Sequence, residues 1–212
     1  MLITGEEKRN SMKGHQSAKL FEKIKPLWEK YDLKKAEPFL KGLNDGSRRD
    51  VEGSEAGYYR LLPVLIDYLN SKQVVELGGA MGAASLMILS ALPKDSRLYS
   101  ITLEEGGQEF SFVKENYPNF VPIVGDDLIL TNWPKELDLN KTDLWFFDSL
   151  HTYDQLHSEL ELYKPFFKKG AIILVDDIHM SEEMFRAWTE FPGDKFDASV
   201  YLHHSGYGIS VI

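Results

Sequence analysis

The fold is decided by the stretch from position 74 to position 85, which reads Val74-Val75-Glu76-Leu77-Gly78-Gly79-Ala80-Met81-Gly82-Ala83-Ala84-Ser85. It begins with a short, mainly apolar run that is typical of a strand buried on both faces. The glycines that follow permit a tight turn and a close approach of a ligand to the backbone. The next residues start a helical pattern, and a helix N-terminus offers free N–H groups. This order predicts an open α/β sheet with a ligand site beyond the strand ends.

The spacing of the glycines excludes two common nucleotide-binding loops. Gly78 and Gly82 are four positions apart, whereas the first and last glycines of the dinucleotide loop G-x-G-x-x-G are five apart. The chain also lacks the G-x-x-x-x-G-K-[ST] run of a phosphate-binding P-loop.

Short apolar runs alternate with helical patterns from residue 71 to residue 212. The predicted strands are 74–77, 98–103, 120–124, 144–147 and 171–175, and the predicted helices are 83–92, 108–117, 153–167 and 181–188. Such alternation is typical of a parallel sheet with helices on both faces. Two further predicted strands, 196–202 and 208–212, are separated by only five residues, which is too few for a crossover helix. We therefore predict a Rossmann-like, seven-stranded, mostly parallel α/β sheet with a C-terminal antiparallel hairpin.

The first 70 residues are expected to form an N-terminal arm and helical cap on a domain of residues 71–212. The pattern predicts, in order, a polar arm over 1–16, helices over 17–31 and 34–43, a loop over 44–50, and a helix from an N-cap at Ser54 to about 68. These helices could also supply the contact surface of a homodimer.

Composition and charge exclude several classes of protein. The formal net charge is −9, which makes a nucleic-acid partner an unlikely one because such proteins usually carry a basic face. There is no cysteine, so disulfides, thiolate metal sites and cysteine nucleophiles are excluded. No apolar run approaches the roughly 20 residues that span a bilayer, and the N-terminus has no apolar signal core. We expect a cytoplasmic protein with no membrane partner.

Acids and histidines follow the fourth and fifth predicted strands in a repeated Asp-x-x-His pattern. Asp148 and His151 follow the fourth strand, and Asp176, Asp177 and His179 follow the fifth. Adjacent strands lie about 4.8 Å apart, so the three carboxylates should converge. Like charges this close repel unless a cation or a proton lies between them. An all-oxygen set of this kind suits Mg²⁺ or a similar divalent cation.

The glycine loop resembles the first motif of the class I S-adenosylmethionine (SAM)-dependent methyltransferases, in which a strand ends in an acid followed by G-x-G-x-G. Glu76, Gly78 and Gly82 occupy motif positions, and Ala80 replaces the usual middle glycine. The resemblance covers about residues 70–212. It implies that SAM is the cofactor and that the loop binds it, through Glu76, Leu77, Gly78, Gly79, Ala80 and Gly82.

The same resemblance implies a ribose contact after the second strand and an adenine contact after the third. The family usually has an acid where this chain has Thr102, so Glu104, with Glu105 behind it, is the ribose candidate. The segment Gly125-Asp126-Asp127 is similar to the one that borders the adenine. The alternative is that these acids are solvated strand ends or form a simple Gly-Asp turn.

The acids are also similar to those of the catechol-type, metal-dependent O-methyltransferases. Asp148, Asp176 and Asp177 fit the metal-binding positions of that subgroup, and Asp148 would also border the cofactor. The run from Phe146 to Tyr153, F-x-D-x-x-H-x-Y, resembles bacterial relatives, many of which act on sugars or natural products. The implied reaction is methylation of a small-molecule hydroxyl (a sugar, a phenol or a natural product), with Asp148 and His151 as catalytic residues. The metal would lower the pKa of the hydroxyl, and His151 would act as the general base.

Several alternatives stay open on the sequence alone. The enzyme could be a metal-independent methyltransferase with His151 as base, or a different metal enzyme built on the paired Asp-x-x-His motifs. It could also be a binding module, given the altered positions Ala80 and Thr102. The acids could simply cap helices. His203 and His204 are placed in the terminal hairpin turn, outside the expected site.

Overall fold

The computed structural model describes residues 15–53, 57–79, 82–104 and 108–212. The sequence predictions for Ser54, Ala80 and Glu105, and for the arm up to residue 14, lie outside the described residues.

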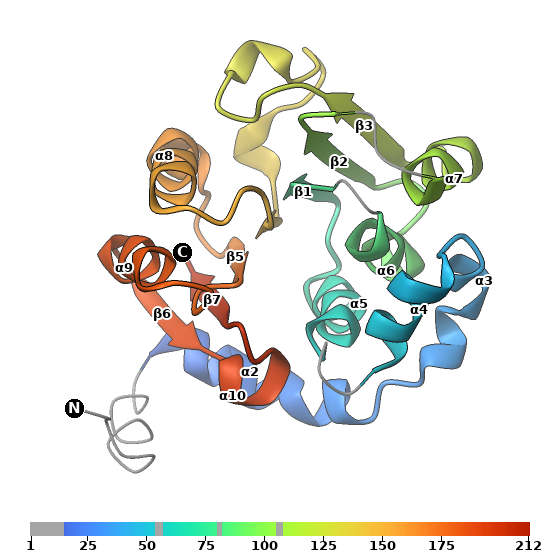
Figure 1. Ribbon diagram of the computed structural model, residues 1–212, viewed down its shortest axis with the longest axis horizontal. Coiled ribbons are helices and arrows are strands. Elements are labelled where there is room, and N and C mark those ends of the chain that lie inside the picture. The colour runs from blue at the N-terminus through green and yellow to red at the C-terminus, as the bar shows by residue number, and fades with distance from the viewer. Residues whose placement is uncertain (1–14, 54–56, 80–81, 105–107) are drawn as a thin grey trace.

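The described chain forms one seven-stranded sheet in the order β3-β2-β1-β4-β5-β7-β6 (Figure 1). The strands are β1 Gln73–Leu77, β2 Arg97–Thr102, β3 Phe120–Val124, β4 Leu144–Phe147, β5 Ile172–Asp176, β6 Asp194–Asp197 and β7 Tyr207–Val211. The first five are parallel, and β7 runs antiparallel to both of its neighbours, β5 and β6. The predicted mostly parallel sheet with an antiparallel terminal hairpin is confirmed.

Helices cover both faces of this sheet, as predicted. The helices are α2 Gln16–Glu29, α3 Glu37–Leu40, α4 Asp45–Glu52, α5 Tyr58–Leu69, α6 Ala83–Ala91, α7 Gln108–Asn116, α8 Tyr153–Tyr163, α9 Glu182–Glu190 and α10 Ser199–Leu202. Short 3-10 turns are η1 Leu33–Lys35, η2 Leu130–Asn132, η3 Leu139–Lys141 and η4 Lys164–Phe166. One core lies between the sheet and α2, α5, α6 and α7, and the other lies between the sheet and α8 and α9.

Up to Val175, the neighbouring strands β4 and β5 consist of apolar residues only, because both of their faces are buried. Successive side chains of a strand point to opposite faces, and β4 shows the consequence. Phe146 packs in the core beneath α5 and α6, whereas Trp145 and Phe147 pack in the core beneath α8. Strands of this composition have no room for a charge before their ends, so the acids collect just beyond them.

Two local predictions are wrong, and side-chain capping explains both. The segment predicted as a strand over 196–202 leaves the sheet at Asp197, whose side chain accepts hydrogen bonds from the backbone N–H (3.0 Å) and hydroxyl of Ser199 and so starts α10. The predicted loop over 44–50 is the start of α4. The side chain of Asn44 caps it by accepting from Gly46 N (2.8 Å) and Ser47 N (3.0 Å).

Helix α2 is hydrogen-bonded to β6, the strand at one edge of the sheet. Asp194, at the start of β6, accepts hydrogen bonds from Gln16 N (2.6 Å) and Ser17 N (2.7 Å). The Ser17 hydroxyl donates to Asp194 O (2.9 Å) and accepts from Val211 N (3.0 Å). His15 itself gives α2 no side-chain cap, so an acid from a distant strand satisfies the free N–H groups of this helix.

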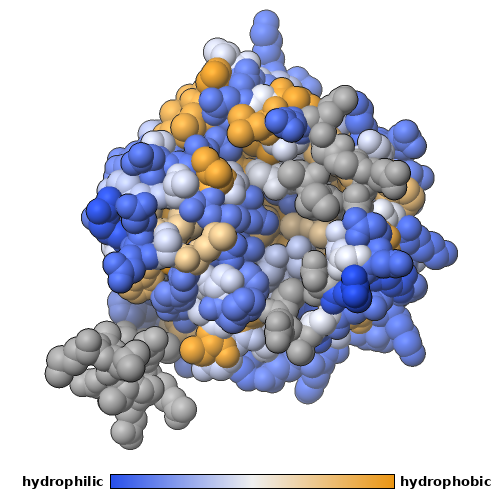
Figure 2. Space-filling model, in the orientation of Figure 1, coloured by the Kyte–Doolittle hydropathy of each residue, from blue (hydrophilic) through white to orange (hydrophobic). Residues whose placement is uncertain are grey.

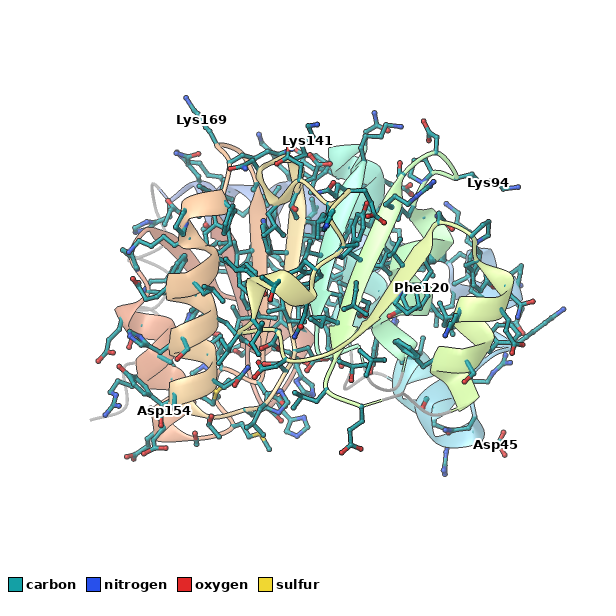
Figure 3. All side chains as sticks on the ribbon, turned by 90° about the horizontal axis from the view of Figure 1, so that it is seen from above. Asp45, Lys94, Phe120, Lys141, Asp154 and Lys169 are labelled. Atoms are coloured by element: carbon teal, nitrogen blue, oxygen red, sulfur yellow. The ribbon has the colours of Figure 1, made fainter. Side chains whose placement is uncertain are left out.

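Charged side chains lie at both ends of the parallel strands, and the acids Asp95 and Asp143 precede β2 and β4. Figure 3 shows Lys94, Lys141 and Lys169, which precede β2, β4 and β5, along one edge of the sheet. Asp154, at the start of α8, and Asp45, at the start of α4, lie toward the opposite edge, where the parallel strands end (Figure 3). The face in Figure 2 is largely hydrophilic, and its hydrophobic residues gather in several separate groups. Asp148, Asp176 and Asp177 lie where β4 and β5 end, so they belong to the edge of the sheet at which the parallel strands end.

Among the described residues, no helix combines the length and the apolar composition that crossing a membrane requires.

The bond between Asp194 and α2 can be tested by Asp194→Ala. Burial alone would raise the pKa of Asp194, but the hydrogen bonds from Ser17 and Gln16 lower it below its ordinary value. We expect the substitution to lower the free energy of unfolding by about 1–2 kcal/mol at pH 7, as loss of a helix cap does. The difference should shrink as the pH falls below about 3.9, because the unfolded wild type then binds a proton at Asp194 that the folded state, with its lower pKa, binds only at still lower pH.

Urea unfolding at pH 7 and pH 3 measures this, with the exposed Asp95→Ala as the matched control. A loss at pH 7 no larger than that of the control would show that the contact contributes nothing.

Candidate functional site

The glycine loop after β1 is pressed between the ends of two neighbouring strands. Gly78 and Gly82 have positive φ values of 94° and 74°, a region that favours glycine. The N–H of Gly78 donates to Ile101 O of β2 (2.9 Å). On its other side, a Cβ on Gly78 would lie 1.8 Å from the carbonyl oxygen of Asp148 after β4. Only glycine permits this contact, so the loop borders the acidic residues directly.

Glu76 lies beneath the loop rather than beside it. Its carboxylate accepts a hydrogen bond from the Ser85 hydroxyl of α6, and a Cβ on Gly79 would meet Ser100 Oγ at 1.9 Å and Glu76 Oε2 at 2.9 Å. Burial raises the pKa of Glu76, and the nearby Ser100 hydroxyl and the hydrogen bond from Ser85 partly offset this rise. The side chain of Leu77 is in the core. Glu76 therefore ties β1 to the first turn of α6.

The expected ribose and adenine contacts lie at the ends of β2 and β3. Thr102 is buried, whereas Glu104 is exposed two residues farther along. Gly125 N donates to Thr102 O (2.8 Å), which brings the two strand ends together. The half-buried Asp126 accepts from Leu128 N (2.8 Å) and so forms a turn. Of these acids, Glu104 is the most open to a ligand.

Asp127 points away from the strand ends and into α8. Its carboxylate accepts from Gln155 Nε2 (2.8 Å), and its carbonyl oxygen accepts from the Tyr163 hydroxyl. Next to it lies the buried Glu159, which accepts from Gln155 Nε2 (2.8 Å) and from the Ser149 hydroxyl. Sequence reasoning did not single out Glu159, because it lies in a helix rich in charged residues.

The acids after β4 and β5 converge as predicted, and two histidines lie among them. His151 Nε2 lies 3.3 Å from Asp148 Oδ1 and 3.5 Å from Asp177 Oδ2. His203 Nδ1 lies 3.4 Å from Asp176 Oδ1 and 3.3 Å from Asp177 Oδ1. We call these five residues the acidic centre. Each histidine bridges two elements, so the centre is held by charge pairing across the sheet end.

Burial and mutual charge shift the pKa values in this centre. Burial, reinforced by Asp176, raises the pKa of Asp148 to about 8, although His151 opposes the shift. Burial likewise raises the pKa of Asp176. The neighbouring carboxylates of Asp176 and Asp177 raise the pKa of His203 to about 10, and the contact with Asp148 raises that of His151. The centre can therefore hold or release protons near neutral pH.

The backbone at Asp177 is in the left-handed region, with φ 55°. Its N–H donates to Asp176 Oδ1 (2.9 Å), and its carbonyl oxygen accepts from Met180 N (2.9 Å). A non-glycine residue in this region is uncommon and often marks a functional turn. Here the turn lets consecutive acids both face His203.

His203 is the residue that sequence reasoning missed. It was placed in a hairpin turn, but α10 forms in that segment and ends at His203, which brings the imidazole to the acidic centre. His179, expected near the acids, pairs instead with Asp197 (Nε2 to Oδ2, 2.7 Å) and stacks on Phe185. The capping residue Asp197 was the available signal, because it predicts the helix that moves His203.

Aromatic residues form one wall of the centre. Tyr58 of α5 lies edge-on to His203 (ring centroids 5.2 Å) and stacks on Tyr59 (4.2 Å) and Tyr207 (5.3 Å). The Tyr207 hydroxyl is buried and has no hydrogen-bond partner among the described residues. Tyr207 pairs with Asp176 across the β5–β7 ladder. This wall gives the acids a partly apolar surrounding.

The groups best placed to hold a metal differ in part from the predicted set. Ligand atoms of Asp176, Asp177 and His203 all lie within 4.8 Å of one another. The predicted set had Asp148 in place of His203. Asp148 remains next to this group through His151.

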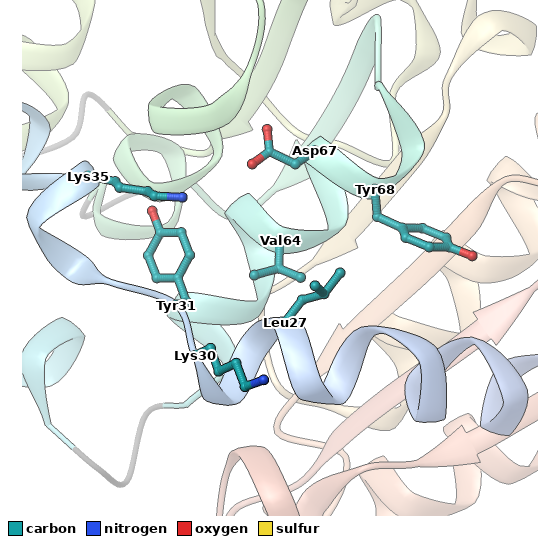
Figure 4. A pocket seen from close by; sticks show the side chains of 7 residues that line it. All are labelled: Leu27, Lys30, Tyr31, Lys35, Val64, Asp67 and Tyr68. Carbon is teal, nitrogen blue, oxygen red and sulfur yellow. The ribbon is translucent and has the colours of Figure 1, made fainter.

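A separate hollow of about 420 Å³ lies between α2 and α5 (Figure 4). Leu27 and Val64 line it together with Lys30, Lys35 and Asp67. No residue of the acidic centre lines it, so it is not part of this site.

Comparison with known proteins agrees with the fold. Residues 75–178 match a family described as a methyltransferase domain. This span runs from β1 through the glycine loop to the acids after β5, and it ends before His203. No curated protein sequence matches the chain.

Similar solved structures include three methyltransferases. The O-methyltransferase TomG of Streptomyces achromogenes, involved in tomaymycin synthesis and in complex with SAM, is 17% identical, with 86% of this chain and 91% of that chain covered and a TM-score of 0.61. An O-methyltransferase from Bacillus cereus in complex with SAH is 12% identical, with coverage of 86% and 92% and a TM-score of 0.60. A methyltransferase from Geobacter sulfurreducens is 19% identical, with coverage of 73% and 77% and a TM-score of 0.56. At these identities, the likeness establishes the fold.

The contact between the glycine loop and the β4 end predicts the effect of Gly78→Ala. The new Cβ would meet backbone atoms of Asp148, which cannot move aside as a flexible side chain can. Gly170→Ala is the matched control, because Gly170 has a similar φ of 84° but nothing within 4 Å of an added Cβ.

We expect Gly170→Ala to lower the free energy of unfolding by about 1 kcal/mol, and Gly78→Ala to lower it by at least about 2 kcal/mol more. Urea denaturation followed by circular dichroism measures both. Equal losses in the two variants would show that the loop is free to move away from Asp148.

Proposed function

Because this chain is a class I SAM-dependent methyltransferase, we propose that it transfers the methyl group of SAM to a hydroxyl oxygen of a small molecule. The observation that supports the proposal is the close approach of Gly78, in the proposed cofactor loop, to Asp148, whose partly exposed side chain pairs with His151. The acceptor would be a sugar, a phenol or a natural product.

The cofactor would lie along the carboxyl edge of β1, β2 and β3. The backbone from Gly78 to Gly82 would border its amino-acid part, and Asp148 would lie beside it. Glu104 is exposed after the end of β2. Its carboxylate would accept hydrogen bonds from both vicinal hydroxyls of the ribose. Asp126 is the better placed adenine contact of its pair, because Asp127 is engaged by α8.

Methyl transfer is a single displacement. A lone pair of the acceptor oxygen forms the new C–O bond as the C–S bond of SAM breaks, SAH leaves, and the hydroxyl proton passes to a base. The pair of Asp148 and His151 is the proposed proton acceptor. The carboxylate of Asp148, with a pKa of about 8, is a stronger base than an exposed aspartate, and His151 holds it in place. Positioning supplies most of the remaining acceleration.

A divalent cation is part of the proposal, and the donor set fits one. Asp176, Asp177 and His203 offer two carboxylates and an imidazole within 4.8 Å. Imidazole is a better ligand for Mn²⁺ and later transition metals than for Mg²⁺, so the set admits both kinds. When bound, the ion would hold the acceptor hydroxyl and lower its pKa.

A metal-independent methyl transfer is the second candidate, and the same contacts favour it. His151 and His203 each lie within 3.5 Å of two carboxylates, so protonated imidazoles can balance the acids without an ion. In that case, His203 would only compensate charge.

The cofactor proposal is tested by isothermal titration calorimetry with SAM and SAH, with and without Mg²⁺, and with NAD as the control. We expect micromolar binding of the adenosyl compounds and no binding of NAD, because the loop spacing does not fit a dinucleotide. Binding of NAD alone, or of none of the three, would contradict the proposal.

The metal proposal is tested by binding of Mn²⁺, followed by electron paramagnetic resonance, to protein treated with chelator. We expect His203→Ala to weaken Mn²⁺ binding by at least about tenfold, as loss of one ligand does. His204→Ala is the matched control, since the neighbouring His204 is outside the ligand group. No Mn²⁺ binding by the wild type, with full methyl transfer after chelation, would favour the metal-independent mechanism.

A further inference from the structure

A second buried acid pair lies beneath the proposed cofactor groove. Asp127 follows β3 and Glu159 belongs to α8, with only 7% and 1% of their surfaces exposed. One amide group holds the two carboxyl groups close to each other. Gln155 Nε2 donates to both carboxyl groups at 2.8 Å. Their buried position excludes direct use of this pair as an open ligand site.

The position of this pair favours one shared proton. Two buried carboxylates bound by the same amide repel each other unless one of them carries a proton. The side-chain groups that donate to them, the Gln155 amide and the Ser149 hydroxyl, are both neutral and bring no compensating charge. Burial raises the pKa of both carboxyl groups. Glu159 is the more deeply buried of the two, so we assign the proton to it.

The neutral carboxyl of Glu159 connects two loops. Its Oε1 accepts from the Ser149 hydroxyl, in the loop after β4, and from Gln155. The same Gln155 amide also donates to Asp127, in the loop after β3. Ser149 follows Asp148 directly, and its Cα would lie 2.8 Å from a Cβ on Gly78. One side chain therefore joins the adenine side of the groove to the catalytic side.

We propose that Glu159, as a neutral carboxyl group, is a positioning residue that fixes the distance between the loops after β3 and β4. It acts through Ser149 and Asp127 and does not touch the substrate. The role in cofactor binding rests on the proposed function, whereas the role in holding the loops does not.

A neutral carboxyl group can be replaced by an amide, which gives a sharp test. In Glu159→Gln, the side-chain oxygen can accept from Ser149 and the amide N–H can donate to Asp127. Glu159→Ala removes both. Glu161→Ala, two residues along the same helix and half exposed, is the matched control.

Two measurements follow these variants: the affinity for SAH by calorimetry, and hydrogen–deuterium exchange of the amides at 148–152. We expect Glu159→Gln and Glu161→Ala to stay within about twofold of the wild type in both. Glu159→Ala should weaken SAH binding and speed the exchange by about tenfold, as loss of a buried hydrogen bond does. Rescue by glutamine is what a charged role would not give, and failure of Glu159→Met, which fills similar space without hydrogen-bonding to Ser149, is what a purely space-filling role would not give.

Equal behaviour of the glutamine and alanine variants would overturn the proposal, as would wild-type behaviour of Glu159→Ala. If Glu159→Ala fails to fold, Ser149→Ala removes only the bond to the β4 loop and should still speed exchange there; unchanged exchange would refute the link. A wild type that does not bind SAH refutes the proposed function, while the exchange experiment still decides the role of Glu159.

Discussion

The rest of the site depends on one backbone contact, that of Gly78 with the carbonyl oxygen of Asp148. It follows from the sheet order, because β1 and β4 are neighbours with Leu77 opposite Phe147. The chain leaves both strands at the same level, and the loop after β1 then has room for no side chain at Gly78. Whatever the glycine loop binds is thus brought against the first acid of the centre. No hinge or lid is needed to bring cofactor and base together.

Apolar strands that end in acids create an electrostatic problem, which the two buried groups of acids solve differently. We propose one proton for the buried pair of Asp127 and Glu159, which would then carry a single charge. In the acidic centre, imidazoles supply the opposite charge, and His203 comes from the antiparallel end of the sheet. Because β7 inserts between β5 and β6, the segment that leads into β7 passes over the end of β5 and brings His203 to Asp176. An all-parallel ending would leave Asp176 without this partner.

Sequence reasoning succeeded where a feature depends on neighbours along the chain. The strand, glycine turn and helix around Gly78, and the acids just beyond β4 and β5, are local patterns, and their convergence follows from strand adjacency. Sequence reasoning failed where only tertiary packing distinguishes residues that look equivalent along the chain. Glu159 and Glu161 look alike in the sequence, and only packing buries the first against Asp127. His203 was missed because the cap at Asp197 overrides the β-branched and aromatic pattern of the segment that follows.

The imidazoles also bear on the chemistry. SAM carries a sulfonium charge that disappears as the methyl group leaves, so an unbalanced cluster of carboxylates beside it would stabilise the reactant more than the transition state. Groups that favour the ground state in this way slow the chemical step. In the proposed reaction, protonated His203, or a divalent ion in its place, would reduce the negative charge that the sulfonium meets, while Asp148 would keep enough basicity to accept the hydroxyl proton. On this argument, the balance of charge in the acidic centre matters more to the rate than the identity of the cation that provides it.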